Sequence, residues 1–277
     1  MRSRLPSLAL ACMTLAACGP GGPPAPPGLA YGLPTQTAVT YTTEARADID
    51  IDAEGQSMQA QGSSSMTLDV AFAESSDGLG VTMEVREFQA TQSNPMGSQS
   101  ADEEGIEGPV VFTLDRTGEA TLVAEPVMTG TTDQFFQPLE LAYGFFPKLP
   151  GRAADVGESW TDTVSYEGTP ADGKIKVTSV LEYTMVGDTV IGGSSLLKIS
   201  FEGTVQQVAS GQITGMDFSQ NLSGTTSGWH LWDSNRRLLV QSHAEGDLRG
   251  SMEVAAAPFP LTVRVRQQED VHLQDGM

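Results

Sequence analysis

Residues that could do catalytic chemistry are few in this chain of 277 residues, and their spacing matches no catalytic motif. The three histidines, His230, His243 and His272, lie too far apart in sequence for the H-E-x-x-H pair that holds zinc on one helix face. No G-x-S-x-G nucleophile elbow occurs, because the segment 157–160 (GESW) lacks the second glycine. We therefore predict no catalytic residues, no metal site and no cofactor, and we expect that the chain is not an enzyme.

Carboxylates are so numerous that a pair of them carries little information about chemistry. Asp48, Asp50 and Asp52 alternate in sequence, so they would line one face of a strand. Calcium binding at that row is the alternative to our interpretation, which is a solvated outer face. His230 and His243 could approach each other on neighbouring strands, but single histidines on strands are usually exposed, and we expect both at the surface.

Cys18 is the residue whose context indicates a definite chemical event. Arg2 and Arg4 precede an apolar run from Leu5 to Ala17, which has the form of an export signal. The run is too short for a spanning helix, which needs about 20 apolar residues. It ends in Leu15-Ala16-Ala17-Cys18, which resembles the lipobox of bacterial lipoproteins. This resemblance implies cleavage after the signal peptide 1–17 and diacylation of Cys18, usually with a third acyl chain on its amino group. The alternative is an ordinary secretory signal with a chance cysteine.

The residues after Cys18 suit a tether. Residues 19–28 read GPGGPPAPPG, a composition that forms neither a helix nor a central strand and extends by about 3.1 Å per residue. We interpret 18–34 as the acylated cysteine and its linker, with the lipid bilayer as partner through the acyl chains, since two or three chains hold a protein stably. Gly19 in place of Asp, by the sorting rule known for lipoproteins, implies the outer membrane. The expected location is the cell envelope, on the periplasmic face or the surface.

The charge balance argues against some partners. Loss of the signal peptide removes two of the 15 basic residues and none of the 35 acidic ones, so the net charge changes from −20 to −22. Nucleic acid is not an expected partner, because phosphate binding depends on Lys and Arg. Our interpretation of the acidic excess is solubility.

Residues 35–273 carry the pattern of a large antiparallel sheet. Apolar side chains alternate with polar ones, and Gly, Asp and Ser separate the segments. About a dozen strands are expected, with tight hairpin turns at Ser75–Gly78 and Asp115–Gly118. A sheet of that size curls to hide its edges. A single domain is expected; the similar hairpins after Phe112 and Trp229 suggest two pseudo-repeats, about 35–127 and 157–273. Expected strands cover 39–51, 66–72, 79–85, 110–114, 120–124, 160–166, 175–185, 197–205, 216–222, 228–233, 238–243, 252–254 and 261–273.

One helical segment is expected near residues 132–146, because apolar residues recur there at spacings of three and four. Pro138 within it predicts a separate first turn or a kink. In a curled sheet its apolar face would serve as a plug or face a ligand. The polar segment 91–108, with four acidic residues, is expected to be a mobile loop. The predicted apolar ligand or plug face consists of Phe135, Phe136, Leu139, Tyr143 and Phe146.

Three features resemble a group of uncharacterised bacterial lipoproteins with a domain of unknown function. They are the Phe/Trp-x-Leu-(x)-Asp hairpins and the segments 146–150 (FPKLP) and 156–160 (VGESW). The broader shape is similar to the LolA/LppX-type half-barrel, a curved antiparallel sheet with helices on its concave face. Since members of that wider fold carry lipids or lipid anchors, the resemblance implies binding of a lipid or other apolar ligand. The alternative is a structural or interaction module, without ligand, whose sheet edge or segment 91–108 contacts another envelope protein.

Overall fold

The computed structural model describes residues 28–95, 97–169, 173–213, 216–255 and 259–274. The predicted signal peptide, Cys18 and most of the predicted linker lie outside these residues. No helix of the described residues is long and apolar enough to cross a membrane. The strands are β1 (Ala38–Ala53), β2 (Gln56–Ser75), β3 (Gly78–Asn94), β4 (Gly97–Asp102), β5 (Ile106–Glu107), β6 (Val110–Leu114), β7 (Ala120–Ala124), β8 (Val127–Met128), β9 (Ser159–Gly168), β10 (Lys174–Ile191), β11 (Ser194–Ile213), β12 (Met216–Asp233), β13 (Leu238–Val254) and β14 (Leu261–Gln274).

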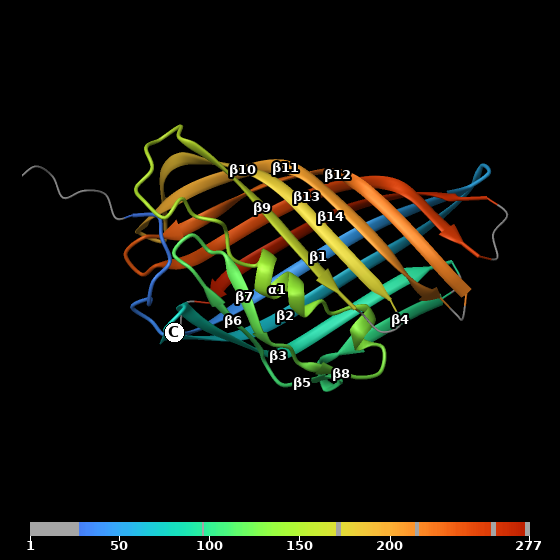
Figure 1. Ribbon diagram of the computed structural model, residues 1–277, viewed down its shortest axis with the longest axis horizontal. Coiled ribbons are helices and arrows are strands. Elements are labelled where there is room, and N and C mark those ends of the chain that lie inside the picture. Colours follow the sequence, from blue (N-terminus) through green and yellow to red (C-terminus); the bar gives the residue numbers. More distant parts are fainter. Residues whose placement is uncertain (1–27, 96, 170–172, 214–215, 256–258, 275–277) are drawn as a thin grey trace, which may run out of the picture.

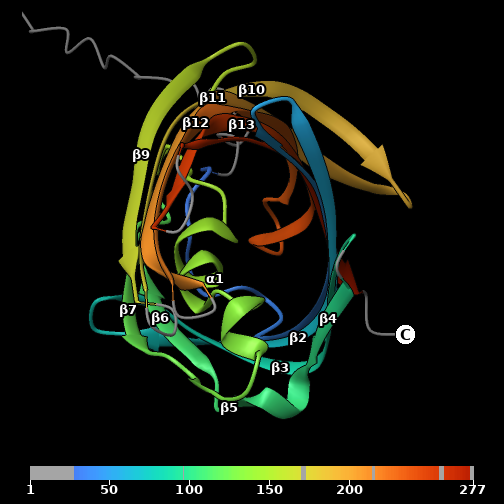
Figure 2. The ribbon, with the colours of Figure 1, turned by 90° about the vertical axis from the view of Figure 1, so that its right-hand side faces the viewer.

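Twelve of these strands form one antiparallel sheet in the order β7-β6-β3-β2-β1-β14-β13-β12-β11-β10-β9, with β4 paired to β3. The sheet curls through 271° into a half-barrel (Figures 1 and 2). Chain neighbours pair as hairpins, and the register of β1 against β14 joins the two halves of the sequence. The predicted fold class is confirmed: a mainly β chain with one large curved antiparallel sheet. The two pseudo-repeats stay a prediction.

The two faces of the sheet differ in polarity because side chains alternate along each strand. Positions on the concave face are mostly apolar or small, whereas charged residues occupy the convex face. There Arg264 bonds to Asp247 at 2.6 Å and Arg266 to Asp50 at 2.9 Å. The row Asp48, Asp50 and Asp52 also lies on this convex face, where Gln61, Gln59 and the Gly55 amide donate hydrogen bonds to the three carboxylates in turn.

Concave glycines allow the strands to bend tightly. A Cβ on Gly224 of β12 would lie 1.9 Å from the carbonyl oxygen of Asp247 on β13. A Cβ on Gly228 would lie 2.0 Å from the carbonyl oxygen of His243. Glycine kinks of this kind are what let a sheet curl instead of staying flat.

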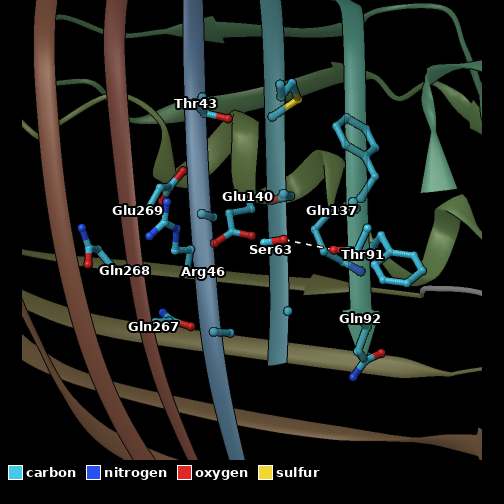
Figure 3. Close-up of a pocket in the computed structure, with 18 of the residues that line it drawn as sticks. Thr43, Arg46, Ser63, Thr91, Gln92, Gln137, Glu140, Gln267, Gln268 and Glu269 are labelled. Atoms are coloured by element: carbon cyan, nitrogen blue, oxygen red, sulfur yellow. Dashed lines mark hydrogen bonds between the residues drawn. The ribbon is translucent and has the colours of Figure 1, made fainter. Parts of the chain in front are cut away.

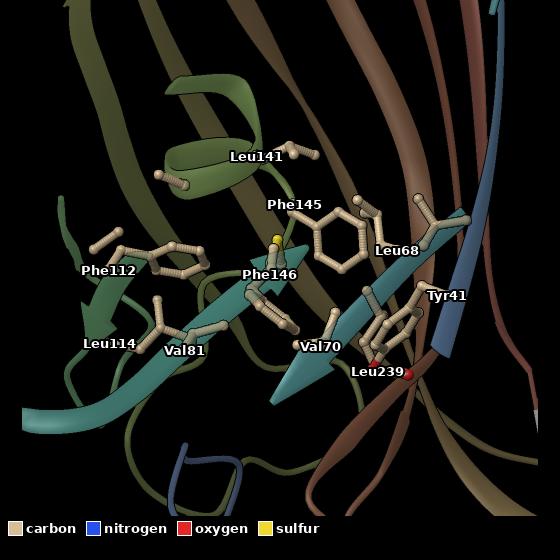
Figure 4. Close-up of a cluster of buried hydrophobic side chains, with 14 of the residues drawn as sticks. Tyr41, Leu68, Val70, Val81, Phe112, Leu114, Leu141, Phe145, Phe146 and Leu239 are labelled. Carbon is tan, nitrogen blue, oxygen red and sulfur yellow. Dashed lines mark hydrogen bonds between the residues drawn. The ribbon is translucent and has the colours of Figure 1, made fainter. Parts of the chain in front are cut away.

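The main hydrophobic core fills one end of the half-barrel. We call this the closed end; it holds the β2–β3, β6–β7 and β12–β13 hairpins, and the opposite end, with the β1–β2 and β11–β12 hairpins, is the open end. Phe146 is buried at its centre, with its ring centroid 5.0 Å from Phe145 and 6.0 Å from Tyr31 (Figure 4). The described chain also enters at this end, where Leu29 pairs with Arg152.

The predicted helical segment is confirmed and has two parts. A 3₁₀ turn, η2 (Thr132–Gln134), precedes helix α1 (Pro138–Gly144), which lies inside the curl (Figure 2). Pro138 occupies the first turn of α1, where its missing amide donor costs nothing. The proline therefore starts the second part, as the sequence predicted.

Two expectations were wrong. The segment 91–108 is not a loop: β3 continues to Asn94, β4 returns along it, and the 3₁₀ turn η1 (Glu103–Gly105) and β5 follow. The sequence did not predict these strands because their side chains are mostly polar. The strands are held in the sheet by backbone pairing. His230 is not exposed: it lies on the concave face, stacked 4.8 Å from Phe201, and its Nδ1 shares a 2.9 Å hydrogen bond with Ser242. Burial lowers the pKa of His230 to about 3, so it is neutral at physiological pH.

Candidate functional site

A hollow of about 360 Å³ lies between the helical segment and the concave face of the sheet (Figure 3). Its walls come from η2, α1 and the strands β3, β2, β1, β14, β13 and β12. Small residues make the room: Ala45 and Ala47 of β1, Gly62 of β2 and Ala90 of β3 line it. A volume of this size is within the ~300–1,000 Å³ typical of small-molecule sites.

One wall of the hollow is aromatic and apolar. Phe135 and Phe136 reach it from the helical segment, and Phe88 and Met66 from the sheet. The rings of Phe88 and Phe136 meet edge-on, with centroids 5.7 Å apart and an interplanar angle of 71°. Such a wall favours contact with an apolar group.

The other wall carries amides and two carboxylates. Gln137 and Glu140 come from the helical segment, and Gln267 and Glu269 from concave positions of β14 (Figure 3). Glu140 is exposed to the hollow and Glu269 is half-buried, so water reaches both, although protein surrounds them.

The pKa values of both carboxylates are raised by desolvation, and at Glu269 repulsion from neighbouring charges adds to it. Desolvation raises the pKa of Glu140. Desolvation, followed by the charges of Glu140 and Asp270, raises the pKa of Glu269. Burial, together with the same two glutamates, also raises the pKa of Tyr166 on β9. Near neutral pH the pair therefore holds on to a proton more readily than free carboxylates would.

The five predicted face residues do not stay together. Phe135 and Phe136 line the hollow, whereas Phe146 lies in the core of the closed end. Leu139 is buried against Gly168 of β9, and Tyr143 stacks on Tyr166 with centroids 5.8 Å apart. The helical segment thus faces the hollow with residues between Gln134 and Leu141, while Leu139, Tyr143 and Phe146 pack as a plug against the sheet and the core.

Sequence reasoning missed Glu140 and Glu269, although a signal for each existed. Glu140 follows Phe136 by four residues and precedes Tyr143 by three, so it shares a helix face with two aromatic residues. Glu269 keeps the same alternation as Val265 and Val271, which places it on the concave face of β14. In both cases a glutamate occupies a position on the same face of its helix or strand as apolar residues. That pattern could have identified Glu140 and Glu269 as candidate site residues.

The two short motifs behind the family resemblance meet across the open seam of the sheet. The Leu149 amide donates a 2.8 Å hydrogen bond to the Thr117 carbonyl in the β6–β7 hairpin, and the buried Lys148 donates to the Gly118 carbonyl at 2.6 Å. On the other side, the indole of Trp160 on β9 donates to the Lys148 carbonyl at 3.0 Å. The segment 146–150 is thus a strap that ties the two edges of the sheet together, which is a structural role.

Among the described residues, no group of three or more His, Cys, Asp or Glu side chains is placed to hold a metal ion. His243 and Asp270, 2.7 Å apart, lie on the convex face, away from the hollow. The hollow itself is lined by aromatic side chains of β3 and the helical segment and by the carboxylates of Glu140 and Glu269.

Comparison with known proteins adds little. No protein-family model and no curated protein sequence matches the chain. Among solved structures, it is similar to Neisserial surface protein A (NspA), with a TM-score of 0.25, 9% identity, and coverage of 85% of this chain and 97% of that one. It is also similar to the translocator domain of autotransporter NalP from Neisseria meningitidis (TM-score 0.22, 10% identity, coverage 86% and 88%). A third is OccK11 (OpdR) of Pseudomonas aeruginosa (TM-score 0.19, 9% identity, coverage 86% and 96%). Likenesses this distant carry no conclusion about location or activity.

Proposed function

We propose that this protein is a non-enzymatic lipoprotein of the cell envelope that binds a lipid or other apolar molecule in its half-barrel. The observation that carries the proposal is the hollow of about 360 Å³ between the helical segment and the concave face. Its aromatic wall offers apolar surface to a ligand, and burial of that surface contributes about 25 cal/mol per Å² removed from water.

The polarity of the sheet supports this function. Charged residues on the convex face suit contact with water, while the core at the closed end holds the sheet curved without filling the space beside Ala45 and Ala90. A preformed space of this kind reduces the cost of binding, because little has to be ordered when the ligand enters.

The anchor and the location belong to the same proposal. The lipobox-like segment ending at Cys18 would tether the chain, and the described domain starts at the closed end, beside Arg152. The acyl chains would make the bilayer a permanent partner.

The test of binding compares two substitutions on adjacent residues of β1. Ala45 faces the hollow, whereas Glu44 is exposed on the convex face. The full-length Cys18→Ser protein, purified without detergent, is titrated with decanol, and lipids that co-purify are identified by mass spectrometry after solvent extraction. We expect Ala45→Phe in that background to lose at least tenfold in affinity and Glu44→Phe to bind as before. Absence of both decanol binding and co-purified lipid would overturn the proposal and favour a ligand-free structural module.

A further inference from the structure

The hollow contains two glutamates, which the binding of a plain hydrocarbon would not require. Glu140 and Glu269 enter it from opposite sides, one from α1 and one from β14 (Figure 3). An all-apolar lining would bind an alkyl chain better, since each carboxylate must give up water when such a ligand covers it.

The described residues place no cation on the concave wall of the hollow. Arg46 is the one basic residue beside it; it lies between the concave residues Ala45 and Ala47, is exposed, and forms no ion pair there. The arginines of β13 and β14 lie on the convex face, paired with Asp247 and Asp50. The two glutamates are therefore left without a compensating charge.

The aromatic residues of the hollow are also separated from Glu269, because β2 and β1 lie between β3 and β14 in the sheet. The ring of Phe136, which follows η2, meets that of Phe88 on β3, and the neighbouring Phe135 also lines the hollow. Glu269 and Gln267 come from β14 (Figure 3). A ligand that satisfies both walls has an apolar part and, at its other end, a positively charged hydrogen-bond donor.

We infer that the hollow selects a cationic amphiphile, in which an alkyl or aryl part packs on Phe88, Phe135 and Phe136 and a primary ammonium group binds between Glu140 and Glu269. This inference rests on the proposed function and adds the chemical class of the ligand. A single ammonium group can donate three hydrogen bonds, enough for both carboxylates and a glutamine carbonyl. The acidic net charge of the whole chain would raise the local concentration of such a ligand.

The acidity of the pair gives the binding a pH signature. The pKa of each glutamate is raised, so binding of a cation, which favours the ionised form, must release protons. Affinity for an amine should rise as the pH rises from 6 to 8.5, because the ammonium group itself stays charged, with a pKa of about 10. Of the charged groups nearby, Tyr166 titrates far higher, and Asp270 and Glu245 lie on the convex face of their strands.

The experiment titrates the full-length Cys18→Ser protein with decylamine, decanol and decanoate, which share one alkyl chain, by isothermal calorimetry at pH 8. We expect decylamine to bind at least tenfold more tightly than decanol, and decanoate to bind most weakly. Glu140→Gln and Glu269→Gln should each weaken decylamine binding about tenfold, flatten its pH dependence and leave decanol unchanged. Glu44→Gln, on the convex face of β1, is the matched control and should change nothing.

The outcomes separate this inference from the proposed function. If decanol or decanoate binds as tightly as decylamine, or if the two glutamine variants retain decylamine affinity, the ligand class is wrong and the binding function stands. If none of the three probes binds and no lipid co-purifies with the protein, both fail. Thermal unfolding of each variant checks that a lost affinity does not reflect a lost fold.

Discussion

At the scale of single residues, the two glutamates of the hollow couple the stability of the fold to pH. The pKa of Glu269 is higher in the folded chain than in the unfolded one, so the folded state binds more protons between the two values. Stability from this group is fully present below the unfolded pKa and is lost as the pH rises through the folded pKa. Desolvation of the Glu269 carboxylate is the main cause of the raised pKa, and the negative charges of Glu140 and Asp270 add to it.

We therefore predict that Glu269→Gln relieves a destabilisation that grows with pH. The melting temperature of the variant should match that of the parent protein near pH 4 and exceed it by about 2–4 °C at pH 9, the shift produced by about 1 kcal/mol in a domain of this size. Circular dichroism melts across this pH range measure it. Glu44→Gln should follow the parent curve, and a constant offset at all pH values would contradict the prediction.

Single residues were also where prediction from sequence was weakest. The pattern of Phe135, Phe136, Leu139, Tyr143 and Phe146 located the helical segment, but it could not say which rings meet the sheet and which meet a hollow. Which rings face the hollow depends on the position of Pro138 in the segment. It also depends on small residues of β1, β2 and β3, which strand pairing brings together opposite the segment.

At the scale of elements, the helical segment does two separable jobs. Phe146, just beyond α1, is 5% exposed and lies within 6.3 Å, centroid to centroid, of the rings of Phe72, Phe112 and Phe145. Phe135, in contrast, is half-buried and lines the hollow. The first ring stabilises the closed end, and the second lines the hollow in which we propose that a ligand binds.

Alanine at these two positions should therefore give opposite results. Phe146→Ala should lower the free energy of unfolding by about 3–5 kcal/mol, the usual cost of removing a buried aromatic ring. Phe135→Ala should cost less than about 1.5 kcal/mol, because its ring is already partly in water, yet weaken decanol binding several-fold. Urea unfolding and calorimetry measure the two effects. Equal losses of stability would show that the segment is a plug throughout.

Strands and helices were predicted well where apolar residues alternated or recurred at helical spacing. They were predicted poorly where most residues of the element are polar. Strands such as β1 and β2 can be predicted from the sequence because apolar residues recur at every second position. This alternation arises because one face of each strand is buried. β4, with the sequence GSQSAD, has only Ala101 buried, so nothing local distinguishes it from a loop. β4 is held to β3 by backbone hydrogen bonds, which do not depend on the side chains and so cannot be predicted from the amino-acid composition of the segment.

At the scale of the whole molecule, the curl of the sheet depends on concave glycines. A methyl group on Gly224 would meet the Asp247 carbonyl oxygen at 1.9 Å, and that atom belongs to the backbone of the next strand. We predict that Gly224→Ala lowers the free energy of unfolding by about 1–3 kcal/mol, as overpacking does. Gly62→Ala is the control, because its new methyl group would have no neighbour closer than 3.9 Å, and its stability should be unchanged or slightly raised. Urea unfolding of both variants decides, and equal stability would mean that the strands adjust without strain.

The position of the described N-terminus sets how a tethered molecule would sit. Leu29 pairs with Arg152 and Tyr31 donates a 2.6 Å hydrogen bond to the Pro147 carbonyl, so the chain emerges from the closed end. A lipid-bearing Cys18 would thus hold the closed end toward the bilayer and leave the open end facing away. The hollow would then receive its ligand from the aqueous side.

Cys18→Ser tests this tether directly. Without the thiol no thioether to an acyl chain can form, and two or three chains are what make membrane release slow. We expect the parent protein in the membrane pellet and most of the Cys18→Ser protein in the soluble fraction, with immunoblotting of both fractions as the measurement. Cys12→Ser, within the same signal, is the control and should leave the protein in the membrane. Mass spectrometry of the N-terminal peptide should show acyl groups in the parent and in Cys12→Ser, and none in Cys18→Ser. A Cys18→Ser protein that stays in the membrane would mean that something other than this cysteine holds it there.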